Sequence, residues 1–230
     1  MPKKIQSWQR KEVIGDATLY LGDCLELGAV LPTNASIVCD PPYGMNWHAS
    51  SARFSGGSES SRRKRGRPKT YQKIYGDDHP FDPSPWIGFP QVILFGCNFF
   101  SASLPTGTTL VWVKKNVHAF GSFLSDAELA WMKGGHGIYC FQYLLQASYG
   151  KGKVKRQHPA QKPIPLMEWC IEHTKGNGPI VDPYMGTGTT GVAALQLHRK
   201  FIGIEIDPKY FDIACERIEQ AHRQPTFKFE

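Results

Sequence analysis

The sequence predicts an α/β fold with a doubly wound, mostly parallel sheet that helices cover on both faces. Short apolar runs typical of buried strands alternate along the chain with segments of helical periodicity, and this alternation is characteristic of parallel sheets. A chain of 230 residues, of which 41% are hydrophobic, can form one medium-sized domain with a substantial core. We therefore expect a single domain over residues 1–230.

Strands are expected where an apolar run is bounded by turn residues or charges. These runs cover residues 17–22, 35–40, 91–96, 109–114, 137–145, 179–184 and 200–206. Helices are expected at residues 126–133, 162–174, 189–199 and 207–223. In the last of these helices, Asp207 can cap the first turn and Pro208 suits the first helical position.

The composition favours a cytoplasmic protein with a polyanionic partner. The formal net charge is +7, a balance that suits binding to a polyanion. The N-terminal segment has no apolar signal region, and no apolar run reaches membrane-spanning length. The six cysteines form no CxxC pair, so we expect neither a metal site nor a disulfide framework.

Nearly all of the excess positive charge lies in one segment, residues 48–70. This segment is rich in serine, glycine and arginine, and it has seven basic residues against one acidic residue, Glu59. Because it has almost no large apolar side chain, it cannot bury enough surface to order itself. We therefore expect it to be mobile until a partner binds.

The stretch IVCDPPYGMNW begins as an apolar strand and ends in a carboxylate, two prolines and a tyrosine. One interpretation of Asp40, Pro41 and Pro42 is a turn that terminates the strand, since proline cannot extend a sheet. The other interpretation is a functional turn that presents Asp40 and Tyr43 at the carboxyl end of a strand, where α/β sheets bind ligands. These residues alone leave both interpretations open.

The stretch VDPYMGTGTTGVAAL indicates a cofactor site. Gly186, Gly188 and Gly191 match the dinucleotide fingerprint G-x-G-x-x-G. Glu205 lies 19 residues after Gly186, where it can bind ribose hydroxyls. Asp182, immediately before the turn, repels a pyrophosphate and suits a ligand with an ammonium or sulfonium group. The pattern favours an adenosine-containing cofactor; a nicotinamide dinucleotide and a purely structural glycine turn are the alternatives.

Five stretches together resemble the amino-group DNA methyltransferases: YLGDCLE (20–26), DPPYG (40–44), HPAQKP (158–163), DPYMGTGTT (182–190) and FIGIEID (201–207). The resemblance is to the β class of that family, in which the DPPY motif precedes the cofactor motif. It implies a Rossmann-like sheet of seven strands with one antiparallel strand, which binds S-adenosyl-L-methionine at the carboxyl ends of its strands.

Carried over by position, the resemblance implies a cofactor site built from four parts of the chain. Asp182 and the glycine turn would hold the methionine part, Glu205 the ribose and Asp23 the adenine. A helix that opens after the QKP stretch would cover the methionine carboxylate. The implied cofactor-binding residues are Asp23, Cys24, Leu25, Gln161, Lys162, Pro163, Asp182, Pro183, Gly186, Thr187, Gly188, Thr189, Thr190 and Glu205.

The resemblance also implies a reaction at the DPPY motif. An exocyclic amino nitrogen is a poor nucleophile because its lone pair is delocalised into the ring. The side chain of Asp40 and the carbonyl of Pro41 would accept its two hydrogens, and the carboxylate would stabilise the developing positive charge. Pro42 holds Pro41 in an extended conformation. Tyr43 would stack on a flipped-out base. These four residues are the candidate catalytic residues.

Two regions are expected to contact double-stranded DNA. The first is a basic insertion, residues 48–80, whose candidate DNA-binding residues are Arg62, Arg63, Lys64, Arg65, Arg67 and Lys69. Residues 65–68 also resemble the core of an AT-hook, but we interpret the insertion as a polycation that raises nonspecific affinity. The second region is a short candidate target-recognition region at residues 116–158.

We expect a stand-alone, site-specific enzyme of the restriction-modification type that methylates N6 of adenine, because DPPY is more typical of adenine enzymes. Cytosine-N4 transfer is the nearest alternative. A nicotinamide-dependent oxidoreductase, a non-catalytic DNA-binding relative, and methylation of RNA or of a protein amide are further alternatives. We expect a bacterial or phage-encoded monomer or weak dimer with no metal and no membrane partner.

Overall fold

The structure is a computed structural model that describes residues 8–46, 74–122, 125–144 and 161–224. Its strands are β1 (Trp8–Ile14), β2 (Ala17–Gly22), β3 (Ser36–Cys39), β4 (Gln91–Phe95), β5 (Gly107–Val113), β6 (Ala127–Gln142), β7 (Ile180–Asp182) and β8 (Phe201–Glu205). Its α-helices are α1 (Cys24–Leu27), α3 (Ser84–Ile87), α5 (Ile164–Glu172), α6 (Thr189–Gln196) and α7 (Pro208–Arg223). Short 3-10 helices are η1 (Gly28–Val30), η3 (Cys97–Phe99), η4 (Ser101–Ser103) and η5 (Val117–Ala119).

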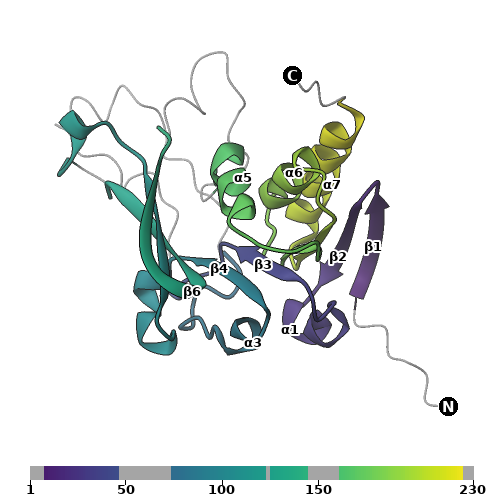
Figure 1. Cartoon of the computed structure of the whole chain (residues 1–230). Helices are drawn as coiled ribbons and strands as arrows, with labels where there is room; N and C mark the ends of the chain where they lie inside the picture. The colour runs from purple at the N-terminus through teal and green to yellow at the C-terminus, as the bar shows by residue number, and fades with distance from the viewer. Residues whose placement is uncertain (1–7, 47–73, 123–124, 145–160, 225–230) are drawn as a thin grey trace, which may run out of the picture.

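All of these strands belong to one sheet, with the order β1-β2-β8-β7-β3-β4-β6-β5. Strands β2, β8, β7, β3 and β4 pair in parallel. Helices α5, α6 and α7 lie together on one side of the sheet, and α1 and α3 lie on the other (Figure 1). The sheet is therefore doubly wound and mostly parallel, as the sequence predicts. Among the described helices, none combines the length and the hydrophobicity that a membrane crossing requires.

Both faces of the central strands are buried, and β3 shows why. All four of its residues are buried. Val38 packs on one face with Leu166 of α5 and Phe211 of α7. Ile37 packs on the opposite face with Trp86 of α3. A strand covered on both sides reads as a continuous apolar run, because neither face meets water.

Most of the predicted elements are confirmed. The seven predicted strand segments correspond to β2, β3, β4, β5, the second half of β6, β7 and β8. The three C-terminal predicted helices correspond to α5, α6 and α7. The predicted cap is also present: the carboxylate of Asp207 accepts hydrogen bonds from the amides of Lys209 (2.8 Å) and Tyr210 (3.3 Å), and Pro208 is the first residue of α7.

The helix predicted at residues 126–133 is wrong, because this segment is the first half of β6. It pairs antiparallel with β4, for example Leu94 with Trp131. β5 lies between the two halves of β6, since Val111 pairs both with Leu129 and with Cys140. Alanine, glutamate, leucine and methionine favour a helix locally, but pairing with two neighbouring strands outweighs that preference.

Strand β1 is a second difference, since it gives the sheet eight strands where seven are expected. It pairs antiparallel with β2 at the edge of the sheet. Since β6 also pairs antiparallel with β4, the sheet has antiparallel strands at two places, where one antiparallel strand was expected. Its sequence, WQRKEVI, is mostly polar, and an edge strand that is half exposed has no apolar run to reveal it. Arg10 pairs with Glu12 of the same strand (2.8 Å) and links β1 to Asp212 of α7 (2.7 Å).

Candidate active site

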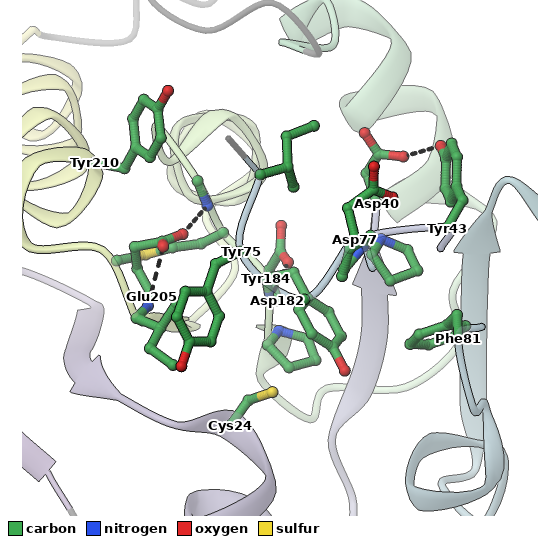
Figure 2. A pocket seen from close by; sticks show the side chains of 18 of the residues that line it. Cys24, Asp40, Tyr43, Tyr75, Asp77, Phe81, Asp182, Tyr184, Glu205 and Tyr210 are labelled. Carbon is green, nitrogen blue, oxygen red and sulfur yellow. Dashed lines mark hydrogen bonds between the residues drawn. The ribbon is translucent and has the colours of Figure 1, made fainter. Parts of the chain in front are cut away.

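A cavity of about 610 Å³ opens at the carboxyl ends of β2, β3, β7 and β8 and is lined by both sequence motifs. In α/β sheets, ligands bind at the carboxyl ends of the strands where the strand order reverses, here between β7 and β3. Figure 2 shows Asp40 and Tyr43 at one side of the cavity, Glu205 and Tyr210 at the other, and Asp182 between them.

Asp40 follows the last residue of β3, and both of its carboxylate oxygens have partners. The hydroxyl of Tyr43 donates to Oδ1. The ammonium of Lys162 lies 2.5 Å from Oδ2. The side chain of Asp40 is 20% exposed. Burial raises the pKa of Asp40, and the charge of Lys162 opposes that rise.

The ring of Tyr43 is held from two sides. It stacks on Phe99 with ring centroids 5.1 Å apart and an angle of 14° between the planes. Gly96, which has a φ of +72°, faces the ring so closely that a Cβ there would lie 2.1 Å from it. A glycine at this position therefore makes room for the tyrosine and adopts a left-handed backbone conformation without strain.

Asp182 ends β7 and is 3% exposed at the centre of the cavity. Its Oδ1 accepts a hydrogen bond from the amide of Tyr184 (3.0 Å), and its Oδ2 accepts one from the hydroxyl of Thr190 (2.5 Å). Burial raises the pKa of Asp182 to about 7. An ionised carboxylate is costly in this environment unless a cation lies beside it.

The glycine turn is held from both ends by charged side chains. Glu205, at the end of β8, accepts hydrogen bonds from the amides of Gly186 (2.8 Å), Ile206 (3.0 Å) and Asp207 (2.8 Å), two of which Figure 2 marks. Burial raises the pKa of Glu205. From α7, the guanidinium of Arg217 donates to the carbonyl (2.5 Å) and the hydroxyl (2.9 Å) of Thr187.

The stretch that follows β2, Asp23 to Leu25, forms another part of the cavity wall. The carboxylate of Asp23 caps α1 by accepting a hydrogen bond from the amide of Leu25 (2.8 Å). Cys24 is buried behind it, and burial raises the pKa of its thiol to about 12, which keeps the thiol protonated. Leu25 is 62% exposed at the rim of the cavity.

Lys162 joins the DPPY motif to β6. Its ammonium lies 3.0 Å from Oε2 of Glu128, and Oε1 of Glu128 lies 2.9 Å from the ammonium of Lys114. Burial alone would lower the pKa of Lys162, but the two carboxylates raise it to about 12. Burial alone would raise the pKa of Glu128, but the two ammonium groups lower it to about 2. Both side chains are therefore charged at neutral pH.

The structure brings nearly all of the described candidate residues together in this one cavity. Pro163 and Gly188 are not part of its lining and instead precede the first turns of α5 and α6. The lining includes Asp23, Cys24, Leu25, Asp40, Pro41, Pro42, Tyr43, Gln161, Lys162, Asp182, Pro183, Gly186, Thr187, Thr189, Thr190 and Glu205. The candidate DNA-binding residues lie outside the described residues: Arg62, Arg63, Lys64, Arg65, Arg67 and Lys69.

Sequence reasoning missed several lining residues. Glu128 belongs to the segment predicted as a helix, so its side chain was not expected beside Asp40. Asp77, which is 3% exposed, accepts hydrogen bonds from the amides of Gly44 (3.0 Å) and Met45 (3.1 Å). The end of the 48–80 insertion is thus packed on the turn that follows DPPY. A single acidic residue in a polar stretch has no local pattern that reveals this contact.

The candidate target-recognition region at residues 116–158 divides into parts. Residues 127–142 form β6, whose first half pairs with β4 within the sheet. Residues 145–158 lie outside the described residues. A contribution to target recognition from this region stays a prediction.

Comparison with known proteins gives the same family from sequence and from fold. Residues 133–216 match the family model described as DNA methylase. The chain is 48% identical over 128 residues to type II methyltransferase M2.LlaDCHI of Lactococcus lactis subsp. cremoris, covering 54% of this chain and 45% of the relative. It is 34% identical over 127 residues to type II methyltransferase M2.DpnII of Streptococcus pneumoniae, covering 54% of this chain and 45% of the relative. The chain thus spans about half the length of these relatives.

Two solved structures share the fold. The M1.HpyAVI–SAM complex superimposes with a TM-score of 0.51 and 26% identity, covering 87% of this chain and 99% of that one. The PvuII DNA methyltransferase, which is cytosine-N4-specific, superimposes with a TM-score of 0.56 and 16% identity, covering 94% and 95%. By its motifs, its fold and these relatives, the chain is similar to the amino-group DNA methyltransferases.

Proposed function

We propose that this protein transfers a methyl group from S-adenosyl-L-methionine to the N6 amino group of a flipped-out adenine in double-stranded DNA. The observation that carries the proposal is the single cavity shared by the DPPY turn and the glycine turn. A methyl donor held between Asp182 and Glu205 would face an amino group held by Asp40. The order of these two motifs along the chain is that of the β class.

The residues at the glycine turn fit this cofactor. S-adenosyl-L-methionine supplies an activated methyl group on a sulfonium, and it also carries an ammonium group. Asp182 is a buried carboxylate whose pKa is raised to about 7 by burial, so a cation beside it is favourable. Glu205 and Asp23 are further carboxylates in the lining. Asp182, immediately before the glycine turn, disfavours a pyrophosphate there, which argues against a nicotinamide dinucleotide.

Asp40 and Pro41 provide the chemistry at the amino nitrogen. Two acceptors on its two hydrogens favour a tetrahedral nitrogen, whose lone pair can then attack the methyl carbon. As the carbon–nitrogen bond forms and the carbon–sulfur bond breaks, positive charge develops on the nitrogen. The carboxylate of Asp40, preplaced in a mostly buried site, stabilises that charge. The positively charged nitrogen then gives one proton to solvent, by way of the carboxylate of Asp40, and becomes a neutral N-methylamino group.

Cytosine-N4 transfer is the second candidate. The PvuII enzyme shares the fold, and the acceptor arrangement at Asp40 suits the amino group of either base. The aspartate at the first position of DPPY supports adenine. In both cases the base must leave the duplex, which costs a few kcal/mol, and stacking on an aromatic ring such as that of Tyr43 offsets about 1–3 kcal/mol of it.

The test is to incubate the purified protein with unmethylated DNA and S-adenosyl-L-methionine, digest the DNA and identify methylated nucleosides by mass spectrometry. We expect N6-methyladenine with the wild-type protein and a loss of at least 100-fold with Asp40→Ala. Asp212→Asn, which removes an exposed carboxylate on α7, is the matched control and should retain activity. N4-methylcytosine would contradict the choice of base. The absence of any methylated base in DNA, with methylated RNA or protein instead, would contradict the substrate class.

A further inference from the structure

The ammonium of Lys162 lies in the wall of the candidate active site, directly beside the candidate catalytic carboxylate. The residue is 7% exposed and lines the cavity. Its Nζ lies 2.5 Å from Oδ2 of Asp40, 3.0 Å from Oε2 of Glu128 and 5.1 Å from the ring centroid of Phe95. An ammonium has three N–H donors and no acceptor. One donor is hydrogen-bonded to Asp40, and Glu128 lies at ion-pair distance, so a donor remains for a ligand.

The charges around this ammonium are balanced. Asp40 and Glu128 supply two carboxylates, and Lys162 and Lys114 supply two ammonium groups. Each charge in this buried set lies beside one of opposite sign, which favours the ionised forms of Lys162 and Glu128. Lys162 is therefore a fixed hydrogen-bond donor, and Asp40 beside it is an acceptor.

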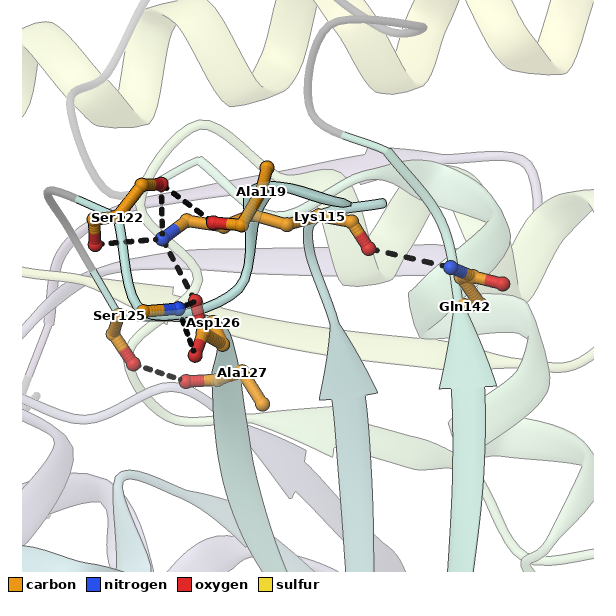
Figure 3. A network of polar contacts seen from close by, with 8 residues as sticks. Lys115, Ala119, Ser122, Ser125, Asp126, Ala127 and Gln142 are labelled. Atoms are coloured by element: carbon orange, nitrogen blue, oxygen red, sulfur yellow. Dashed lines mark hydrogen bonds and ion pairs between the residues drawn. The ribbon is translucent and has the colours of Figure 1, made fainter. Parts of the chain in front are cut away.

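The connection between β5 and β6 holds this set in place. Directly beside Lys114, the ammonium of Lys115 lies 2.8 Å from the carboxylate of Asp126 and donates to the carbonyl of Ser122 (3.1 Å) (Figure 3). The amide of Lys114 donates to the carbonyl of Asp126 (2.9 Å). These contacts fix Lys114, which directly follows β5, beside Glu128 on β6.

We propose that Lys162 contacts the target base: with Asp40 it presents a donor and an acceptor side by side to the ring nitrogen and the adjacent amino group. This inference rests on the proposed function and adds a residue that determines its specificity. Asp40 accepts a hydrogen from the amino group, as proposed above. Lys162 donates to the neighbouring ring nitrogen.

The pair would select bases by the order of donor and acceptor along their Watson–Crick edges. Adenine has its amino group beside N1, and cytosine has its amino group beside N3, so both place a donor next to an acceptor. Guanine and thymine place a carbonyl next to an N–H, which would set oxygen against the carboxylate and N–H against the ammonium. Asparagine and glutamine read adenine through a similar acceptor and donor pair. The pair of Asp40 and Lys162 thus admits adenine or cytosine and excludes guanine and thymine.

The experiment replaces the ring nitrogen that Lys162 would contact by C–H. The methylated sequence is first mapped by sequencing DNA that the protein has modified. A synthetic duplex with that site is then made with 1-deazaadenine at the target position, or 3-deazacytosine if the product is N4-methylcytosine. We expect single-turnover transfer by the wild-type protein to fall roughly 10- to 100-fold on the deaza duplex, the loss of one hydrogen bond to a charged donor.

The matching variants are Lys162→Met and the double variant Lys162→Met with Glu128→Gln, which keeps the charges of the set balanced. Both should transfer slowly to the natural base and lose most of the difference between the natural and the deaza duplex. Their affinity for S-adenosyl-L-methionine, measured by calorimetry, should stay within about twofold of wild type. Lys200→Met, at an exposed position outside the cavity, is the control and should behave as wild type.

Two outcomes would overturn the inference. In the first, the wild-type protein transfers equally well to the natural and the deaza base, a result that needs no variant. In the second, both Lys162 variants lose cofactor affinity yet keep the discrimination against the deaza base, which would assign the ammonium to the methionine carboxylate. If the wild-type protein transfers no methyl group to any DNA, the proposed function itself fails, and this result is distinct from both.

Discussion

Binding of S-adenosyl-L-methionine is expected to weaken as the pH falls below 7, because the cofactor's cationic groups need an ionised Asp182. Burial raises the pKa of this carboxyl to about 7, well above its ordinary value of 3.8. The residue is 3% exposed at the centre of the cavity, between the DPPY turn and the end of β8. Protonation would replace an attraction between opposite charges by a neutral contact.

The magnitude follows from the titration of one group. With a pKa of about 7, about half of Asp182 is ionised at pH 7 and roughly one tenth at pH 6. If the cofactor binds the ionised form alone, its affinity falls about fivefold from pH 7 to pH 6 and about tenfold more from pH 6 to pH 5. Above about pH 8 the α-amino group of the cofactor loses its proton, and the affinity falls again.

Isothermal titration calorimetry between pH 5.5 and 9 measures the affinity for the cofactor on both sides of its maximum, below pH 7 and above pH 8. Asp182→Asn should remove the fall in affinity below pH 7 and weaken the fall above pH 8, because it removes the carboxylate that the ammonium group pairs with. Adenosine, which has neither an ammonium nor a sulfonium group, should show no dependence on Asp182 and serves as the control ligand. An affinity for the cofactor that is constant from pH 5.5 to 7.5, or a fall in affinity below pH 7 that persists in Asp182→Asn, would refute the reasoning.

Asp182 should also make the ligand-free protein less stable as the pH rises. Because its folded-state pKa is raised, its contribution to stability is present below about pH 4 and is lost as the pH rises through about 7. The difference is about 4 kcal/mol at most, from a shift of about three pKa units. Burial raises the pKa of Asp40 and Glu205 in the same direction. Denaturant titrations of wild type and Asp182→Asn at pH 4 and pH 8 measure this contribution.

Two substitutions test the support of the DPPY turn. Gly96→Ala places a Cβ 2.1 Å from the ring of Tyr43 at a φ of +72°, so we expect a loss of about 1–3 kcal/mol in unfolding free energy and slower transfer at unchanged cofactor affinity. Asp77→Ala leaves two backbone amides without their acceptor and should cost about 1–3 kcal/mol, while Asp77→Asn should recover part of it. Denaturant titrations and single-turnover rates measure both, and wild-type stability in either alanine variant would contradict the assigned contact.

The sequence by itself determined the elements whose signal is local. Strands β3 and β7 are buried on both faces, and β2 and β8 are buried on one face and partly buried on the other, so their sequences are apolar runs. Helix α7 has its cap at Asp207 and a proline at its first position. The acidic residues at the ends of these strands, Asp40, Asp182 and Glu205, could be predicted from the sequence because each of them interrupts an apolar run. The topology of a parallel sheet brings the carboxyl ends of neighbouring strands to one edge, so three stretches far apart in the chain meet in one cavity.

The tertiary structure alone decided what depends on partners distant in sequence. Residues 126–133 have the composition of a helix and become a strand, because β4 and β5 offer backbone partners on both sides. That pairing turns Glu128 toward Lys162, 34 positions further along the chain, and so builds the charged set beside Asp40. No local pattern encodes a contact between single side chains of different elements, because burial and the balance of charge arise only when the sheet has formed.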